Sequence, residues 1–599
     1  MTEKLQKNWV YIVLALMIAL QLGSIIYYFH VHKQGYHSDE IWSYGYANSY
    51  YEKHIYVDDN NEWTYTDEWL DTQVLKDYVV VNEGEQFTYD SVYNNQVYDL
   101  SPPFHSMVLH TICSFFPEQY SRWFSFSINI ISFVLTMIFL FKIAKMHSNN
   151  DVFSICCCAL YGFSLGARDT FIYLRMYAMC TALAMIIIYN IFRFLQNYQK
   201  THKLIQRNLI VACVVSYIAF LTHFYMLSFM GIMTFFICAV AFLKKEYKLT
   251  FGYGFSMLLM FVLTVIVFPT MFQTAEYNAG DATATMNYNF EMRLRILADF
   301  VMTKLFNISV PISSEGYLKI AMGVLVFVSI LCIPLVYLLR ETKVVKKIGR
   351  MLRLCVKSPC QILRYFERRI NWFYIILLLS VAGQIVVVGE TAKVHVMGPI
   401  VDRYIFFLYP CVVLVGLALL YQVVRVFFRK KKIAKGILVF CSLLLVGINI
   451  YNCTQYGDYL FRRRLDGNIE DYIADRKCIF VRNAPWMLTT MVPTLIEADE
   501  FAMIQYMDYS KIEDLYIEKS SEGPIYVLID ASFTTSLEEE IETNEISGEV
   551  EADEEAKKQK QLYEDMLQLL EDLDPHTEMK YVTGQYILNR PMVLYVINP

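Results

Sequence analysis

The chain has 599 residues, of which 56% are hydrophobic and only 18% are charged. A soluble domain normally carries about a quarter charged residues and does not repeat apolar runs of about 18 residues or more, each of which is long enough to cross a bilayer. The composition therefore excludes an ordinary soluble enzyme and predicts a multi-pass membrane protein. The net charge of −6 gives no support for nucleic-acid binding.

The apolar runs predict a mainly α-helical protein with about eleven transmembrane helices. The first run, Trp9 to Phe29, is too long for the core of a signal peptide and has no small-residue cleavage site, so we expect a retained first helix. The expected spans are 9–29, 120–143, 152–166, 171–194, 207–221, 225–243, 251–271, 317–339, 372–389, 402–427 and 434–453.

The positive charges predict the orientation of these helices. The strongly basic segments between spans all fall on one side if the N-terminus is cytoplasmic, and positively charged loops favour the cytoplasm. We therefore expect the C-terminal tail outside the cytoplasm. The basic segments are 193–207, 244–245, 340–369 and 429–435.

The predicted topology divides the chain into a transmembrane domain, residues 1–455, and an extracytoplasmic tail, residues 456–599. Within the first, residues 30–118 form an acidic outer loop, with fourteen Asp and Glu between residues 31 and 100 against three Lys. A second large outer loop covers 272–316. The short apolar stretch after Pro102 and Pro103 is expected to be a re-entrant or interfacial helix.

The tail is predicted to be a small α/β domain. Short β-branched runs, "CIFVRN", "IYVLID" and "MVLYVIN", alternate with helical stretches, and Lys557 to Leu573 reads as an amphipathic helix. The very acidic stretch 537–556 is expected to be a disordered insert. No nucleotide-binding glycine loop is present in the tail, so we interpret it as a cover or a platform for a partner.

The polar residues that are candidates for chemistry gather on the predicted outer side. Asp39 and Glu40 directly follow the first helix, and a carboxylate there could act as a general base for an acceptor hydroxyl. Adjacent side chains diverge, so only one of the two should face a given substrate. The alternative is a solvated acidic loop, because this whole loop is acidic.

Histidines and arginines add further candidates. His105 follows the Pro-Pro pair, with a packed interface residue as its alternative. Arg168 and Asp169 are expected at an outer loop, and Arg175 and Tyr177 in the first two turns of the span 171–194. An arginine such as Arg175, one turn below the outer surface, must find an anion, line water or snorkel. The planar fork of Arg175 suits a phosphate, and the alternative is an internal pair with Asp169 or Asp39. The remaining candidates are His223, in a tight outer hairpin, and Arg403 and Tyr404, at the outer end of another span.

Together these residues resemble the GT-C superfamily of polytopic glycosyltransferases, near its protein mannosyltransferase-like and aminoarabinose-transferase-like members. The likeness covers roughly residues 5–455. The residues that carry it are the acidic pair (Asp39, Glu40), "PPF-H" (Pro102, Pro103, His105), "RMYA" (Arg175, Met176, Tyr177, Ala178), "TH-F" (Thr222, His223) and "RY…P" (Arg403, Tyr404, Pro410). The long insert between Tyr50 and Leu100 and the acidic tail depart from the family pattern.

The resemblance implies an enzyme of the cell envelope in a bacterial cell membrane. Such enzymes move a sugar from a polyprenyl-phosphate carrier to a glycan, protein or lipid acceptor. By the same likeness Asp39 would be the base of an inverting displacement, with Arg175, Tyr177, Arg403 and Tyr404 on the donor phosphate. His105, Arg168, Asp169 and His223 would line the substrate pocket. Some relatives use a divalent metal, Mg²⁺ or Mn²⁺, and Asp39, Glu40 and His105 could hold one.

Two other functions remain open at this point. A transporter or flippase of a lipid-linked sugar would be expected to show two similar halves with interrupted helices and a site at the membrane midplane, and the sequence shows no such repeat. A non-catalytic scaffold that presents the tail would tolerate the loss of the Asp39 carboxylate but not the deletion of residues 457–599.

Overall fold

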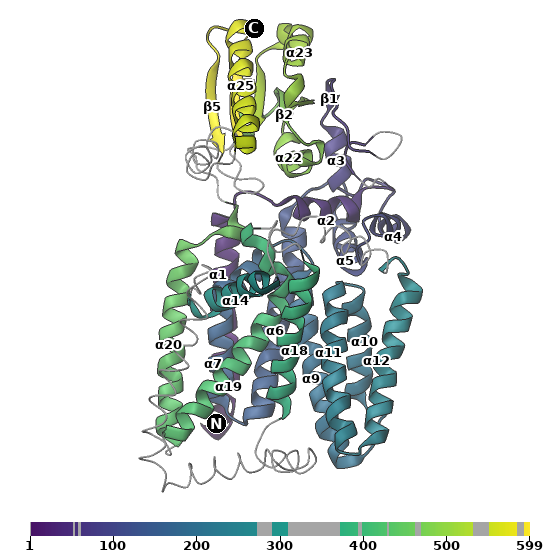
Figure 1. The fold of residues 1–599 in the computed structure, drawn as a ribbon, viewed down its shortest axis with the longest axis vertical. Helices are drawn as coiled ribbons and strands as arrows, with labels where there is room; N and C mark the ends of the chain where they lie inside the picture. Colours follow the sequence, from purple (N-terminus) through teal and green to yellow (C-terminus); the bar gives the residue numbers. More distant parts are fainter. Residues whose placement is uncertain are drawn as a thin grey trace. The chain divides into compact units, whose positions relative to one another are not determined.

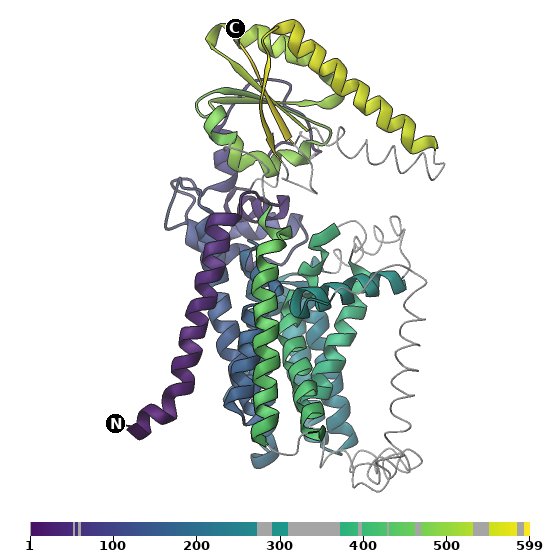
Figure 2. The same cartoon turned by 90° about the vertical axis from the view of Figure 1, so that its left-hand side faces the viewer.

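The computed structural model describes residues 2–51, 54–57, 62–271, 290–308, 372–392, 398–427, 431–461, 469–530, 550–583 and 592–598. The chain forms two compact units (Figures 1 and 2). We call residues 1–21, 133–170 and 180–456 the helical unit, and residues 22–132, 171–179 and 457–599 the loop–sheet unit. Helices α1 (Thr2–Tyr27) and α6 (Arg122–Ser148) contribute to both.

The described part of the chain confirms a mainly helical, multi-pass fold. Eight of its helices are long and apolar enough to cross a membrane, and the bent pair α7 and α8 would make a ninth. Helix α10 is apolar but shorter, and the expected span 317–339 lies outside the described residues. The other helices of the helical unit are α7 (Asp151–Gly162), α8 (Leu165–Ile172), α9 (Tyr177–Thr201), α10 (Arg207–Phe220), α11 (Phe224–Leu243), α12 (Tyr247–Val267), α14 (Phe290–Phe306), α18 (Trp372–Thr391), the 3₁₀ helix η2 (Gly398–Leu408), α19 (Tyr409–Phe427) and α20 (Lys431–Gln455).

Burial distinguishes central from peripheral helices in the helical unit. In the most apolar window of α9, 72% of the residues are buried inside the protein, against 17% in that of α12. Apolar side chains that are exposed on a membrane helix face lipid, so α12 is a peripheral helix and α9 a central one. Helix α11 packs on α12 and α18, and α7 packs on α19 and α20. Helix α14, from the second predicted outer loop, lies across this unit (Figure 1).

One predicted boundary was wrong. We expected a span over 171–194, but α8 ends at Ile172 and α9 begins at Tyr177. The side-chain amide of Asn129 donates to the carbonyls of Phe171 and Tyr173, at 3.0 and 2.8 Å. These bonds replace helical ones, so the chain turns here.

The loop–sheet unit contains a six-stranded mixed sheet in the order β1-β3-β2-β4-β6-β5. Strands β2, β3 and β4 are parallel, and β6 runs antiparallel between β4 and β5. The strands are β1 (Leu70–Asp71), β2 (Lys477–Arg482), β3 (Glu500–Gln505), β4 (Ile525–Asp530), β5 (Glu578–Thr583) and β6 (Met592–Ile597). The three runs predicted as strands correspond to β2, β4 and β6, so the predicted α/β tail is confirmed.

Helices cover the sheet and join it to the first loop. Helices α23 (Lys511–Lys519) and α25 (Val550–Leu573) share one hydrophobic core with β2, β3, β4 and β6 (Figure 2). Strand β1 belongs to the first predicted outer loop and pairs with β3. The other elements of this unit are the π-helical turn η1 (Tyr28–His32), α2 (Ser38–Asn48), α3 (Gln73–Val79), α4 (Tyr89–Tyr98), α5 (Phe104–Cys113), η3 (Asp458–Leu460), α21 (Ile469–Ile473), η4 (Pro485–Met487), α22 (Leu488–Leu495), η5 (Tyr506–Asp508) and η6 (Ser520–Glu522).

Candidate active site

A capping box places the acidic pair at the start of α2. His37 is the N-cap: its Nδ1 accepts from the backbone N–H of Asp39 at 3.1 Å, and the Glu40 carboxylate accepts from the backbone N–H of His37 at 2.9 Å. Both bonds satisfy donors that a helix N-terminus leaves open. Nδ1 thus acts as a hydrogen-bond acceptor in this cap.

The Glu40 carboxylate is an anchor inside the loop–sheet unit. It is fully buried and forms an ion pair with Lys33 Nζ at 2.8 Å, and its Oε1 also accepts from the backbone N–H of Leu174 at 2.8 Å. Lys33 donates in turn to the carbonyl of Tyr459. Glu40 thus links the stretch 33–40 to Leu174 and, through Lys33, to Tyr459, and this arrangement favours a structural role over the catalytic one predicted for it.

Asp39 has a different environment. Its carboxylate is 13% exposed and accepts from the Tyr173 hydroxyl at 3.3 Å, with His37 Nδ1 3.6 Å away. A carboxylate that is partly exposed can accept a proton from a substrate hydroxyl. Asp39 is therefore the member of the pair whose surroundings suit a general base.

Arg175 lies beside Asp39 in the turn between α8 and α9. Its Nη1 donates to the backbone carbonyl of Asp39 at 3.2 Å and to the Ser43 hydroxyl at 3.1 Å. Burial opposes its charge, but the Asp39 carboxylate raises the pKa of Arg175 above its ordinary value. Its buried Nε–H has no hydrogen-bond partner in the described part of the chain, so the guanidinium keeps a donor for an anionic ligand. Tyr177 opens α9, and its ring stacks on Tyr173 at 5.9 Å.

A second carboxylate, Asp99, lies near Arg175. It was not identified as a candidate residue from the sequence. Burial raises the pKa of Asp99, while Ser101 and Arg175 lower it. Burial raises the pKa of Tyr46, and the nearby Asp99 raises it further. Asp99 immediately precedes "LSPPF", but no residue pattern in the first loop distinguishes it from the other acidic residues there.

His105, on α5, is a buried neutral histidine. Its side chain is enclosed, and burial together with the Arg175 charge lowers its pKa to about 3. Such a ring does not carry charge at neutral pH. Its surroundings match the packed alternative that its position in the sequence left open.

Because the pKa of His105 is lowered in the folded chain, we expect this residue to reduce the stability of the protein at acid pH. The unfolded chain takes up a proton near the ordinary pKa of 6.5, but the folded chain does so only near 3. Between these values the unfolded state binds more protons, so this group lowers the free energy of unfolding as pH falls, by about 1.4 kcal/mol per pH unit. We expect the thermal midpoint of His105→Asn to fall less steeply from pH 6 to pH 4 than that of the wild type. An equal slope would contradict this, and exposed His30→Asn is the control.

In the helical unit, Arg168 and Asp169 form an internal ion-pair network. Asp169 Oδ1 contacts Arg168 at 2.7 Å and Oδ2 contacts Lys304 of α14 at 2.6 Å, and all three side chains are at most 3% exposed. Arg168 also donates to the carbonyls of Cys453 and Tyr456. These residues were expected at an outer loop, but they lie in helix α8 and join it to α14 and the end of α20. With these partners, the network favours a structural role for Arg168 and Asp169 over the substrate pocket predicted for them.

The remaining predicted residues gather at the start of α11, also in the helical unit. His223 caps α11 by accepting from the backbone N–H of Tyr225 at 3.1 Å. The Tyr225 ring lies 5.5 Å from Tyr404, and the Arg403 guanidinium lies 5.0 Å above the Tyr404 ring. The structure thus brings His223, Arg403 and Tyr404 together, as it brings Asp39 and Arg175 together in the loop–sheet unit.

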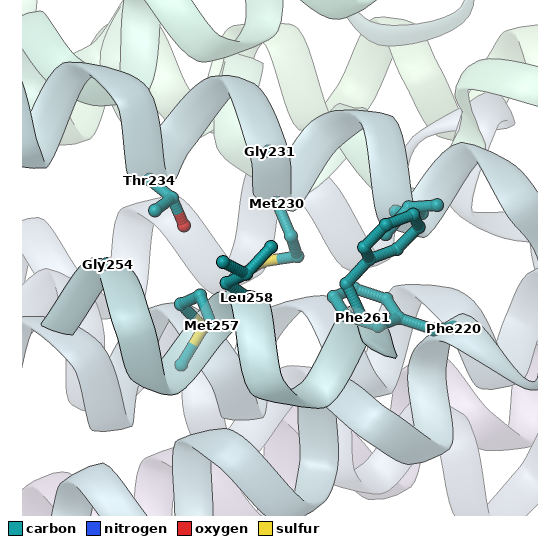
Figure 3. A pocket seen from close by; sticks show the side chains of 9 residues that line it. Phe220, Met230, Gly231, Thr234, Gly254, Met257, Leu258 and Phe261 are labelled. Carbon is teal, nitrogen blue, oxygen red and sulfur yellow. The ribbon is translucent and has the colours of Figure 1, made fainter. Parts of the chain in front are cut away.

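An apolar pocket of about 290 Å³ opens among α10, α11 and α12 (Figure 3). Met230, Met257, Leu258 and Phe261 line it, and a Cβ added to Gly231 would meet no atom within 4 Å. The lining begins at Leu227, one turn along α11 from His223. A pocket of this kind between membrane helices suits an aliphatic chain.

The metal prediction stays open. Within the described residues, no group of three or more His, Cys, Asp or Glu side chains could hold a metal ion. Of the suggested ligands, Glu40 is occupied by Lys33 and Leu174.

The fold and these two groups of residues define a multi-pass membrane protein with a carboxylate and an arginine side by side. No family model matches the chain, and no curated protein matches it. Among solved structures it is similar to ArnT from Cupriavidus metallidurans bound to undecaprenyl phosphate, with 9% identity, a TM-score of 0.40 and coverage of 98% of each chain. Because the TM-score is below 0.5, we draw the function from the residues of this chain.

Proposed function

We propose that this protein is a membrane glycosyltransferase that moves a sugar from a polyprenyl-phosphate carrier to an acceptor hydroxyl. The observation that carries the proposal is the pairing of Asp39 with Arg175. A partly exposed carboxylate and a guanidinium with an unused Nε–H lie within one folded unit, and Arg175 bonds to the backbone of Asp39 itself. Sugar transfer from a phosphate needs such a pair, a proton acceptor and a cation.

In the proposed reaction Asp39 accepts the proton of the acceptor hydroxyl. The acceptor oxygen forms a bond to the anomeric carbon, and the bond between that carbon and the phosphate oxygen breaks. The phosphate leaves with the electron pair, and Arg175 stabilises its growing negative charge. A single displacement of this kind inverts the anomeric configuration.

We also propose a separate lipid-binding group at the start of α11, within the helical unit. Arg403 and Tyr404 offer a cation and a hydroxyl for an anionic lipid headgroup, and the pocket beyond His223 offers apolar walls for an isoprenoid chain. All of these residues lie in the helical unit, whose helices cross the membrane in which such a lipid resides.

Replacing Arg175 tests the role of the guanidinium. Arg175→Ala is expected to reduce turnover by about 10²- to 10³-fold, as the loss of one preorganised donor to a developing oxyanion does. Arg175→Lys should recover only part of this, because an ammonium lacks the fork. The measurement is the release of polyprenyl phosphate, with Arg295→Ala, a partly exposed arginine of the helical unit, as the control. Full activity in Arg175→Ala would exclude the proposed role.

The proposal as a whole is tested with purified protein in lipid nanodiscs and a panel of polyprenyl-phosphate sugars. Mass spectrometry should find free polyprenyl phosphate and an acceptor that carries the sugar in the inverted configuration. If no donor is consumed, and the protein instead moves a lipid-linked sugar across the bilayer of sealed vesicles, the transporter interpretation replaces this one.

A further inference from the structure

Two tryptophans meet next to the proposed base. Trp42 lies on α2, three residues after Asp39, so both side chains fall on one face of the helix. Trp486, in the turn η4 that follows β2, comes from the tail, and its ring centre lies 6.3 Å from that of Trp42 at an interplanar angle of 44°. Both side chains are partly exposed.

Hydrogen bonding holds one of these rings in place. The indole N–H of Trp42 donates to the Thr489 hydroxyl at 3.1 Å, and α2 packs on α22, which carries Thr489. Because the polar edge of Trp42 is bound to the tail, the ring is fixed in a defined orientation and does not move as a free surface side chain. The tail thus contributes both an aromatic ring and the bond that orients its neighbour.

Indole faces are large, flat and electron-rich, and they attract groups with a positive edge. The C–H groups on one face of a sugar ring form such an edge, while its hydroxyls point outward around the ring. A sugar lying on these indoles could therefore present a hydroxyl toward a carboxylate one helical turn away.

The negative charge of the first loop, residues 31–100, favours an acceptor without negative charge. Residues 31–100 carry fourteen Asp and Glu against three Lys and no Arg. A phosphate-rich polymer would be repelled by this loop, whereas a neutral sugar would not. A peptide gains no comparable match, because its backbone offers no flat C–H face for an indole.

We propose that Trp42 and Trp486 form an acceptor platform, and that the acceptor is a neutral glycan whose sugar ring stacks on it. This inference rests on the proposed function and extends it by naming the acceptor class and by assigning the tail to acceptor binding. Trp42 and Trp486 touch the acceptor, and Asp39 takes its proton.

The test measures acceptor binding without any donor, so that it does not depend on sugar transfer. The full-length protein is titrated with neutral tri- and tetrasaccharides, with phosphorylated oligosaccharides and with Ser/Thr-containing peptides, and binding is followed by saturation-transfer NMR. Neutral saccharides should bind the wild type. Trp486→Ala should weaken this binding by about three- to tenfold, the loss expected for one aromatic contact, and Trp486→Phe should restore part of it.

Trp9→Phe is the matched control, because Trp9 is 47% exposed on α1 and belongs to the other unit. Its binding should equal that of the wild type. A circular dichroism spectrum and thermal midpoint of Trp486→Ala like those of the wild type exclude misfolding as the cause of its weaker binding. In a transfer assay, Trp486→Ala should raise the acceptor KM more than it lowers kcat.

Three results would overturn the platform: no binding of any neutral saccharide, equal binding by Trp486→Ala, or preferred binding of the peptides. Each leaves the proposed function standing if donor consumption is observed. Conversely, saccharide binding that needs Trp486 but accompanies no donor consumption would support the platform and reject the transferase.

Discussion

Asp39→Asn is expected to abolish sugar transfer while leaving the protein folded, with a loss of about 10²- to 10⁴-fold in kcat. The amide keeps the size of the carboxylate, and its oxygen still accepts from the Tyr173 hydroxyl. The bond from Arg175 goes to the backbone carbonyl of residue 39 and is unchanged. The substitution removes the negative charge of residue 39 and with it the capacity to accept a proton.

The control for this variant is Asp77→Asn, which removes a carboxylate from the same acidic loop. The Asp77 carboxylate accepts a hydrogen bond from the Gln73 side chain of the same helix, α3, at 2.7 Å, so its loss should leave turnover unchanged. Turnover is measured as polyprenyl phosphate released per protein. If Asp39→Asn retains wild-type turnover, another group is the base.

The second large effect is on stability. Lys33→Met is expected to lower the free energy of unfolding by about 3–5 kcal/mol, because it leaves the buried Glu40 carboxylate without its cation. The pair is fully buried and lies 2.8 Å apart. Removing both charges, in Lys33→Met with Glu40→Gln, should cost much less than Lys33→Met alone, since no uncompensated charge remains.

These variants are compared by thermal unfolding in detergent, with exposed Lys76→Met as the control. If Lys33→Met unfolds at the wild-type temperature, Glu40 is not the anchor that we describe. Rescue by the double variant also separates the structural role of Glu40 from catalysis, because a catalytic Glu40 would leave the double variant folded but inactive.

The sequence predicted the helical part of this fold well because long apolar runs have one stable form in a bilayer. It also separated Asp39 from Glu40 correctly as side chains that diverge, since adjacent helical residues lie about 100° apart. Which of the two is buried could not be predicted. The answer depends on Lys33, on the N–H of Leu174 and on the carbonyl of Tyr459, and the last two are far away in the chain.

Other features of the structure also depend on contacts between residues that are far apart in the sequence. Arg168 and Asp169 were expected to line a substrate pocket. Their partner Lys304 is 135 residues away in the chain, so the ion-pair network that satisfies all three charges could not be predicted from the sequence. Strand β1 has two residues and no recognisable pattern, because its pairing with β3 forms it. Trp42 and Trp486 are far apart in the sequence, and their rings meet because α2 packs on α22 in the folded chain.

The central claim, that an anionic lipid headgroup binds at Arg175 beside Asp39, is tested most directly by photo-crosslinking. A polyprenyl-phosphate analogue with a diazirine on its first isoprene unit is bound to the wild-type protein, irradiated and mapped by peptide mass spectrometry. We expect labelling of the segment 171–179, competed away by unmodified polyprenyl phosphate and lost in Arg175→Ala. Labelling that spares this segment, or that persists unchanged in Arg175→Ala, would contradict the claim.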